Sequence, residues 1–95
     1  MESAVNGKEL ILVVDDQPAN LKVISGVLNN EYALSVANSG ERAIKILETL
    51  QPGLILLDIM MPGMDGFQVC RILKQNEKTR DIPVIFLSAK TETDD

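Results

Sequence analysis

Three short runs of consecutive apolar residues stand out along the chain, at residues 10–14, 54–57 and 84–87. Each run is bounded by polar or turn-forming residues, which is typical of a strand buried on both faces of a parallel sheet. A weaker segment at residues 32–37 alternates apolar and small polar residues, and this alternation predicts a strand at the edge of the sheet.

Between these strands the apolar residues recur at spacings of three and four, which indicates amphipathic helices. Pro18 begins the first, predicted over residues 18–28, because proline suits the first helical turn. Asn38 and Glu41 have the spacing of a capping box and predict the start of the second helix. A third helix is predicted after Asp65. Alternating strands and helices predict an α/β fold, with a parallel sheet that carries helices on both faces.

The composition and net charge of the chain argue against several classes of function. The 95 residues suffice for one small domain. A net charge of -5, with no cluster of lysine or arginine, argues against binding to nucleic acid or to an anionic membrane, and the lack of histidine excludes histidine-based catalysis. The single cysteine, Cys70, is expected in the core and fits a reducing compartment. No apolar stretch approaches the length of a membrane span, so we expect a cytoplasmic protein.

Polar side chains follow three of the predicted strands at the point where each strand ends. Asp15 and Asp16 follow the first apolar run, Asp58 follows the second, and Ser88 follows the third. Because the carboxyl ends of parallel strands lie at one edge of the sheet, we expect these groups to lie together. Crowded carboxylates repel one another unless a cation neutralises them, and Mg²⁺ suits such oxygen ligands. A carboxylate beside this ion can act as a nucleophile towards a phosphoryl group.

Each of these residues also has a purely structural interpretation. An acid after a strand often serves as a turn residue or a helix N-cap, and for Asp16 alone the two interpretations have similar weight. For Asp65, which precedes the third helix, we expect the N-cap role. Ser88 taken alone is more often a turn residue than a ligand. The coincidence of polar residues at three strand ends favours a functional site.

Three segments carry a resemblance to a known family. These are Val-Val-Asp-Asp at residues 13–16, Leu-Asp-Ile-Met-Met-Pro-Gly-Met-Asp-Gly at residues 57–66 and Pro-Val-Ile-Phe-Leu-Ser-Ala at residues 83–89. Together they closely resemble the receiver domain of two-component response regulators, and the resemblance runs from Glu9 to the end of the chain. It implies a flavodoxin-like (CheY-like) fold of three layers, in which the complete family domain has the strand order 2-1-3-4-5.

The resemblance also implies roles for individual residues. Asp58 would accept a phosphoryl group from a histidine kinase or a phosphotransfer protein. Asp15, Asp16, Asp58 and the backbone carbonyl of Met60 would hold Mg²⁺, and Ser88 would contact a phosphoryl oxygen. Such a domain is a regulatory phosphoacceptor in a phosphorelay and not an enzyme, apart from its own phosphorylation and dephosphorylation.

The sequence departs from the family pattern at its carboxyl end. The family domain continues through a fourth helix, a fifth strand that ends in a phosphate-binding lysine, and a fifth helix. We therefore expect an incomplete receiver domain over residues 9–95, with strand order 2-1-3-4, after a flexible terminus at residues 1–8 and within a longer regulator. Without a fifth strand the apolar strand at residues 84–87 becomes an exposed edge, so we expect self-association by edge pairing or exchange of elements.

Two other functions stay open at this point. The chain could keep the acidic pocket and serve as a structural or oligomerisation fragment that does not signal. A Mg²⁺-dependent phosphohydrolase with an aspartate nucleophile is less favoured, because that class usually carries a second acid two residues after the nucleophile, and here that residue is Met60.

Overall fold

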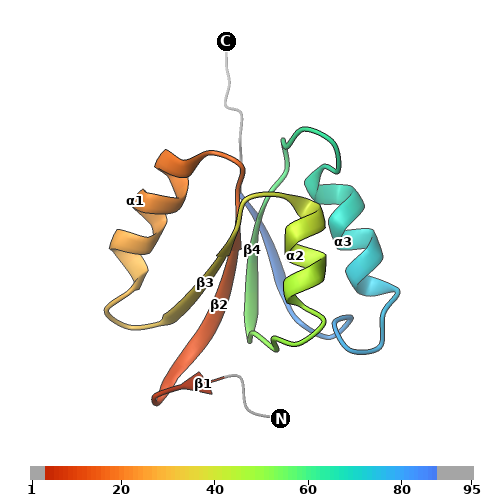
Figure 1. Cartoon of the computed structure of the whole chain (residues 1–95). Coiled ribbons are helices and arrows are strands. Elements are labelled where there is room, and N and C mark those ends of the chain that lie inside the picture. Colours follow the sequence, from red (N-terminus) through yellow and green to blue (C-terminus); the bar gives the residue numbers. More distant parts are fainter. Residues whose placement is uncertain (1–3, 88–95) are drawn as a thin grey trace.

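A computed structural model of the protein describes residues 4–87, which form one sheet with helices packed against it (Figure 1). The strands are β1 (Ala4–Val5), β2 (Lys8–Val14), β3 (Ala33–Ala37), β4 (Leu54–Asp58) and β5 (Val84–Leu87). The helices are α1 (Pro18–Leu28), α2 (Gly40–Ile46) and α3 (Gly66–Lys74). The alternation of strands and helices from β2 onwards is the one that the apolar pattern predicts.

Four parallel strands make up the body of the sheet, in the spatial order β3-β2-β4-β5. Counted along the chain from β2, this is the predicted 2-1-3-4 order of a flavodoxin-like sheet. β2 lies in the interior, because Leu12 pairs with Ser35 of β3 on one side and with Ile55 of β4 on the other. Among the described residues β3 pairs with β2 alone, so the edge position predicted from its alternating pattern is confirmed.

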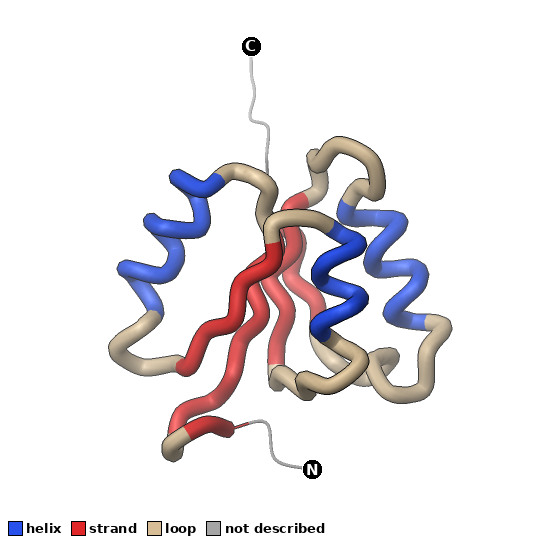
Figure 2. Tube along the Cα trace, viewed as in Figure 1, coloured by secondary structure: helices blue, strands red, loops and turns tan. Residues whose placement is uncertain are grey.

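A hairpin at the amino end is a feature that the sequence analysis did not predict. β1 pairs antiparallel with the start of β2, with Ala4 opposite Glu9 and Val5 opposite Lys8 (Figure 2). The two residues between them, Asn6 and Gly7, have φ angles of 53° and 80°. Two positive φ angles in a two-residue loop are typical of a type I′ turn, whose twist suits a hairpin. The other residues of the predicted flexible terminus, 1–3, lie outside the described part.

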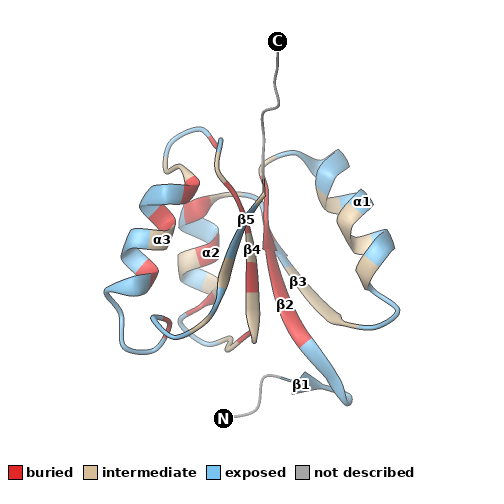
Figure 3. Cartoon of the chain, turned by 180° about the vertical axis from the view of Figure 1, so that it is seen from behind, coloured by how far each residue is buried: buried red, intermediate tan, exposed pale blue. Residues whose placement is uncertain are grey.

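The helices cover both faces of the sheet, and α1 lies on one side while α2 and α3 lie on the other (Figure 1). The main apolar core lies between the sheet and the helices α2 and α3, where alternate residues of β2 and β4 pack against these two helices. Its members are Leu12, Val14, Ala37, Ala43, Leu47, Ile55, Leu57, Met61, Val69 and Leu73. α1 contributes no buried residue (Figure 3). Its Val23 and Val27 are exposed. No described helix has both the length and the apolar character needed to cross a membrane.

β5 differs from the sequence expectation of a strand buried on both faces. Ile85 is 52% exposed and Phe86 is 37% exposed. An apolar sequence is necessary for burial on both faces, but burial also requires elements packed over those faces. Within the described residues β5 is in addition an edge strand, with β4 as its one partner. The Phe86 ring packs on the ring of Phe67 from α3, with centroids 5.1 Å apart. Cys70 is half-buried and packs against the edge of the main core.

The helix starts test the predicted caps. α2 begins one residue later than expected, because Ser39 and not Asn38 is its N-cap, and the Ser39 hydroxyl accepts a hydrogen bond from the Arg42 N–H over 3.1 Å. The N-cap role of Asp65 at α3 is confirmed. Its carboxylate accepts from the Gln68 N–H, and the Gln68 side chain accepts from the Asp65 N–H, both over 2.9 Å.

Candidate functional site

The sheet register brings three carboxylates to one edge. Val14, the last residue of β2, pairs with Leu57 of β4, so the residues that follow them, Asp15 and Asp58, lie side by side at the edge of the sheet, with Asp58 as the last residue of β4. The Asp15 N–H also donates to the Ala37 carbonyl over 3.1 Å, which extends the ladder to β3 by one bond. The arrangement confirms that strand ends meet at one edge, as the parallel topology predicts.

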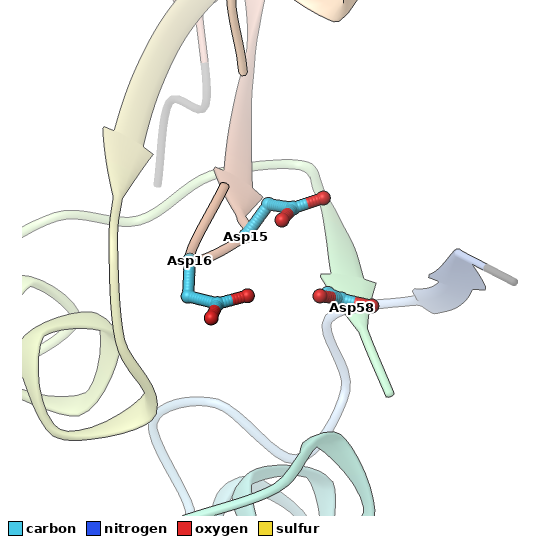
Figure 4. A group of neighbouring side chains, drawn as sticks. All are labelled: Asp15, Asp16 and Asp58. Carbon is cyan, nitrogen blue, oxygen red and sulfur yellow. The ribbon is translucent and has the colours of Figure 1, made fainter. Parts of the chain in front are cut away.

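Asp15, Asp16 and Asp58, here called the acidic cluster, offer one carboxylate oxygen each, and these oxygens lie within 4.8 Å of one another. Figure 4 shows the Asp16 and Asp58 side chains turned towards each other from neighbouring chain segments. Asp15 and Asp58 are buried, with 3% and 4% of their surface exposed, while Asp16 is half-buried. The cluster therefore combines three formal negative charges with little access for water to two of them.

Local hydrogen bonds fix the orientation of two of these carboxylates. Asp15 accepts from the Gln17 N–H at Oδ1 over 2.9 Å and from the Asn20 side-chain amide at Oδ2 over 3.2 Å. Asp58 accepts from the Met60 N–H at Oδ1 over 3.3 Å. Each bond joins an acid to the loop or helix that directly follows its strand, so the side chains are oriented by the same segments that place them.

The electrostatics of the acidic cluster raise the pKa of Asp58 above its ordinary value. Burial is the largest cause, because the charged form loses its hydration. The negative charge of Asp15 acts in the same direction, followed by that of Asp16, while the hydrogen bond from the Met60 N–H opposes them. The folded state thus holds Asp58 in an environment that disfavours its charge until a cation is added.

The donor set of the acidic cluster fits a hard divalent ion such as Mg²⁺. Its three donors are carboxylate oxygens close enough to share one ion, and a cation would relieve the repulsion that raises the pKa of Asp58. The Met60 backbone lies at the site, since its N–H bonds to Asp58. That the Met60 carbonyl is a metal ligand stays a prediction.

Ser88, the predicted contact to a phosphoryl oxygen, lies outside the described residues. Leu87, which precedes it in the chain, pairs with Asp58 in the register between β4 and β5. The role of Ser88 therefore stays a prediction from the resemblance.

Three residues of the site were not singled out from the sequence. Gln17 and Asn20 hold Asp15, and Gly66 packs directly on the backbone of Asp58. Asn20 lies in the first turn of α1, and the periodicity that predicts this helix does not report that its side chain reaches Asp15. Gly66 carries no side chain, and its role depends on a close approach that appears only in three dimensions.

Comparisons with known proteins agree with this geometry. A family model described as the response regulator receiver domain matches residues 11–95. The response regulator PleD of Caulobacter vibrioides is 49% identical over 80 residues, which are 83% of this chain but 18% of that protein. The chain thus spans less than a fifth of the length of this relative.

Two solved structures extend the agreement to three dimensions. The N-terminal domain of a response regulator receiver protein from Methanoculleus marisnigri JR1 matches with a TM-score of 0.82 and 44% identity, covering 88% of this chain and 69% of that one. The receiver domain of the sensor histidine kinase PA1611 from Pseudomonas aeruginosa PAO1, solved with a magnesium ion coordinated in its active site cleft, matches with a TM-score of 0.83 and 31% identity, covering 87% and 69%. On the family match, the sheet order and the acidic cluster together, this chain belongs to the family of response regulator receiver domains.

Proposed function

We propose that Asp58 accepts a phosphoryl group in a Mg²⁺-dependent reaction, and that the donor is a phosphohistidine of a sensor histidine kinase or a phosphotransfer protein. The observation that carries the proposal is the position of Asp58 at the end of β4, buried beside Asp15 and Asp16 with their oxygens within 4.8 Å. A receiver domain is a regulatory phosphoacceptor and not a conventional enzyme, so the expected outcome is one modification per chain.

The transfer needs little from the protein beyond position and charge. A carboxylate oxygen of Asp58 forms a bond to phosphorus, the phosphorus–nitrogen bond of the donor breaks, and its electron pair returns to the imidazole nitrogen. The Met60 N–H and the strand register hold the nucleophile in place. Mg²⁺, when bound, supplies positive charge to the carboxylates and to the transferring oxygens.

Mg²⁺ is the cofactor that best suits the acidic cluster, with Asp15, Asp16, Asp58 and the Met60 carbonyl as its proposed holders. The support is the all-oxygen donor set and the presence of magnesium in the cleft of the related PA1611 receiver domain. Ser88 is proposed to contact a phosphoryl oxygen. A cytoplasmic location is proposed as well, because the single cysteine fits a reducing compartment and is half-buried without a disulfide partner.

The experiment that tests this function uses beryllofluoride, a stable mimic of the phosphoryl group. We expect the backbone amide signals of Asp58 and Met60 to shift when Mg²⁺ binds, and the signals of Asp58, Met60 and Leu87 to shift further when beryllofluoride is added with Mg²⁺. Beryllofluoride without Mg²⁺ should leave them unchanged. The matched control is Asp58→Asn, which removes the nucleophile and keeps the side-chain shape. Equal shifts in wild type and in Asp58→Asn would refute the proposed role of Asp58.

A second proposal concerns self-association, and it is favoured by the exposed apolar surface of β5. Ile85 and Phe86 are exposed on a strand that has one pairing partner among the described residues, and Phe67 extends the apolar surface onto α3 with 53% of its own surface exposed. Exposed apolar edge strands favour pairing with another chain. Light scattering at micromolar concentration should show a dimer or larger species that Ile85→Lys weakens. A stable monomer in wild type would contradict the proposal.

A further inference from the structure

Gly66, the first residue of α3, lies directly behind the loop that leaves the acidic cluster. It is buried, and its N–H donates a hydrogen bond to the Ile59 carbonyl over 2.9 Å. This bond joins the start of α3 to the residue that follows Asp58. The loop over residues 59–65 is therefore closed at its base by the backbone of Gly66.

The space at Gly66 leaves no room for a side chain. A Cβ atom at this position would overlap the Asp58 carbonyl oxygen, and it would lie 2.8 Å from the Ile59 Cα and 3.0 Å from the Asp58 carbonyl carbon. All three atoms belong to the backbone, so no side chain can rotate away to relieve the contact. Any larger residue must displace the Asp58–Ile59 peptide or the first turn of α3.

The first turn of α3 cannot easily move away to relieve this overlap. This turn is held by the reciprocal capping bonds between Asp65 and Gln68, and the Val69 side chain of α3 is fully buried in the main core. The Asp58–Ile59 peptide, in contrast, is followed at once by Met60, whose N–H holds the Asp58 carboxylate over 3.3 Å. A shift of this peptide would move the carboxylate and the Met60 backbone together.

We infer that Gly66 is a positioning residue of the acidic cluster. Because Gly66 has no side chain, α3 can pack directly against the Asp58–Ile59 peptide. This contact holds Asp58 and the Met60 backbone in the geometry that binds a divalent cation. The inference rests on the proposed function, since it concerns the same site. It assigns Gly66 an effect on metal affinity that is separate from its effect on the stability of the fold.

The test measures Mg²⁺ affinity and unfolding in four forms of the 95-residue chain. Gly66→Ala is placed in a Gly26→Ala background, because Gly26 lies in α1 with open space around it, and alanine there should add helix stability. Gly26→Ala alone is the matched glycine control. Leu73→Ala, a core truncation at the far end of α3, is the control for lost stability. Calorimetric titration gives the affinity, and urea unfolding gives the stability.

Gly66→Ala is expected to weaken Mg²⁺ binding by about tenfold or more, as removal of a supporting contact around a metal site typically does. Leu73→Ala should lower the urea midpoint of unfolding at least as much as Gly66→Ala does, and it should leave the Mg²⁺ affinity unchanged. Unchanged Mg²⁺ affinity in the Gly66→Ala chain would overturn the inference and leave the proposed function standing. Absence of Mg²⁺ binding in wild type would overturn both.

Hydrogen exchange on the wild-type chain tests the same inference if the Gly66→Ala chain does not fold. If Gly66 holds the loop before any metal binds, its N–H should be protected in metal-free buffer as strongly as the Val69 N–H, which bonds to the Asp65 carbonyl in the same helix. Rapid exchange of the Gly66 N–H beside a protected Val69 N–H would show that the loop is not held, and would overturn the inference.

Discussion

The Met60 N–H donates a hydrogen bond to the Asp58 carboxylate over 3.3 Å, so the loop that leaves β4 turns back at once onto the acid that ends this strand. The bond favours the ionised form of Asp58. Burial and the neighbouring charges of Asp15 and Asp16 oppose it, and their combined effect is larger, because the pKa of Asp58 is raised. The metal-free site therefore holds a charge that the fold disfavours.

Replacing Asp58 by asparagine should stabilise the metal-free protein at neutral pH. Because the pKa of Asp58 is higher in the folded than in the unfolded chain, the ionised carboxylate destabilises the fold above that pKa. The gain from Asp58→Asn should shrink as the pH falls through the folded pKa towards about 3.9, the value of an unperturbed aspartate. Urea unfolding of both forms at several pH values measures this, and a difference that does not change with pH would contradict the account.

Addition of Mg²⁺ should stabilise the wild-type chain, and chelation should reverse the effect. A ligand that binds only the folded state at a hundred times its dissociation constant adds about 2.7 kcal/mol to the free energy of unfolding. Thermal unfolding with Mg²⁺ and with a chelator measures the difference. The stabilisation should be largely lost in Asp16→Asn, whose half-buried carboxylate faces Asp58. Equal stabilisation of the wild-type and Asp16→Asn chains would show that the ion binds outside the acidic cluster.

The strand ends could be predicted from the sequence because parallel topology converts chain order into spatial position. The apolar runs that end at Val14 and Leu57 predict two strands of one parallel sheet, so the acids that follow them must lie at the same edge. That the two strands are neighbours was implied by the family resemblance, and their register confirms it. The support around these acids could not be predicted in the same way. Two contacts depend on how the helices approach the strand ends: the hydrogen bond from Asn20 to Asp15 and the packing of Gly66 on Asp58. The periodicity of a sequence does not report this approach.

The other differences have physical causes as well. Asn6-Gly7 is a strong signal for a tight hairpin, but the short strand before it is too small to appear as an apolar run. Ser39 displaces Asn38 as the α2 cap, because either side chain can accept the bond and the choice depends on where the chain turns. At β5 the apolar sequence predicts burial on both faces, but burial also requires elements packed over each face, and Ile85 and Phe86 are exposed.

The capping box of α3 should contribute measurably to stability. Asp65→Ala removes the acceptor for the Gln68 N–H and should lower the free energy of unfolding by about 1 kcal/mol. Asp65→Asn keeps an acceptor in the same place and should change it much less. Urea unfolding followed by circular dichroism compares the two variants. A similar loss in both would show that the negative charge, rather than the hydrogen bond, carries the effect.

The segment between α3 and β5 depends on a buried hydroxyl. Thr79 is 3% exposed, and its Oγ1 donates to the Leu73 carbonyl over 2.7 Å, which ties the segment to the end of α3. Thr79→Val keeps the shape and removes this donor, although the carbonyl still accepts from the Asn76 N–H, so the substitution should cost about 0.5–1.5 kcal/mol. Thr79→Ser keeps the hydroxyl and should retain more of the stability in the same unfolding assay. If valine is tolerated better than serine, packing and not the hydrogen bond is the dominant contribution.

The central claim is that the acidic cluster makes Asp58 a Mg²⁺-dependent phosphoacceptor. The most direct measurement is intact mass spectrometry of the chain after incubation with acetyl phosphate, with Mg²⁺ or with a chelator. The account predicts the mass increase of one phosphoryl group with Mg²⁺, none with the chelator, and none in Asp58→Asn. A chain that gains no phosphoryl group with Mg²⁺, or gains it equally in Asp58→Asn, would contradict the claim.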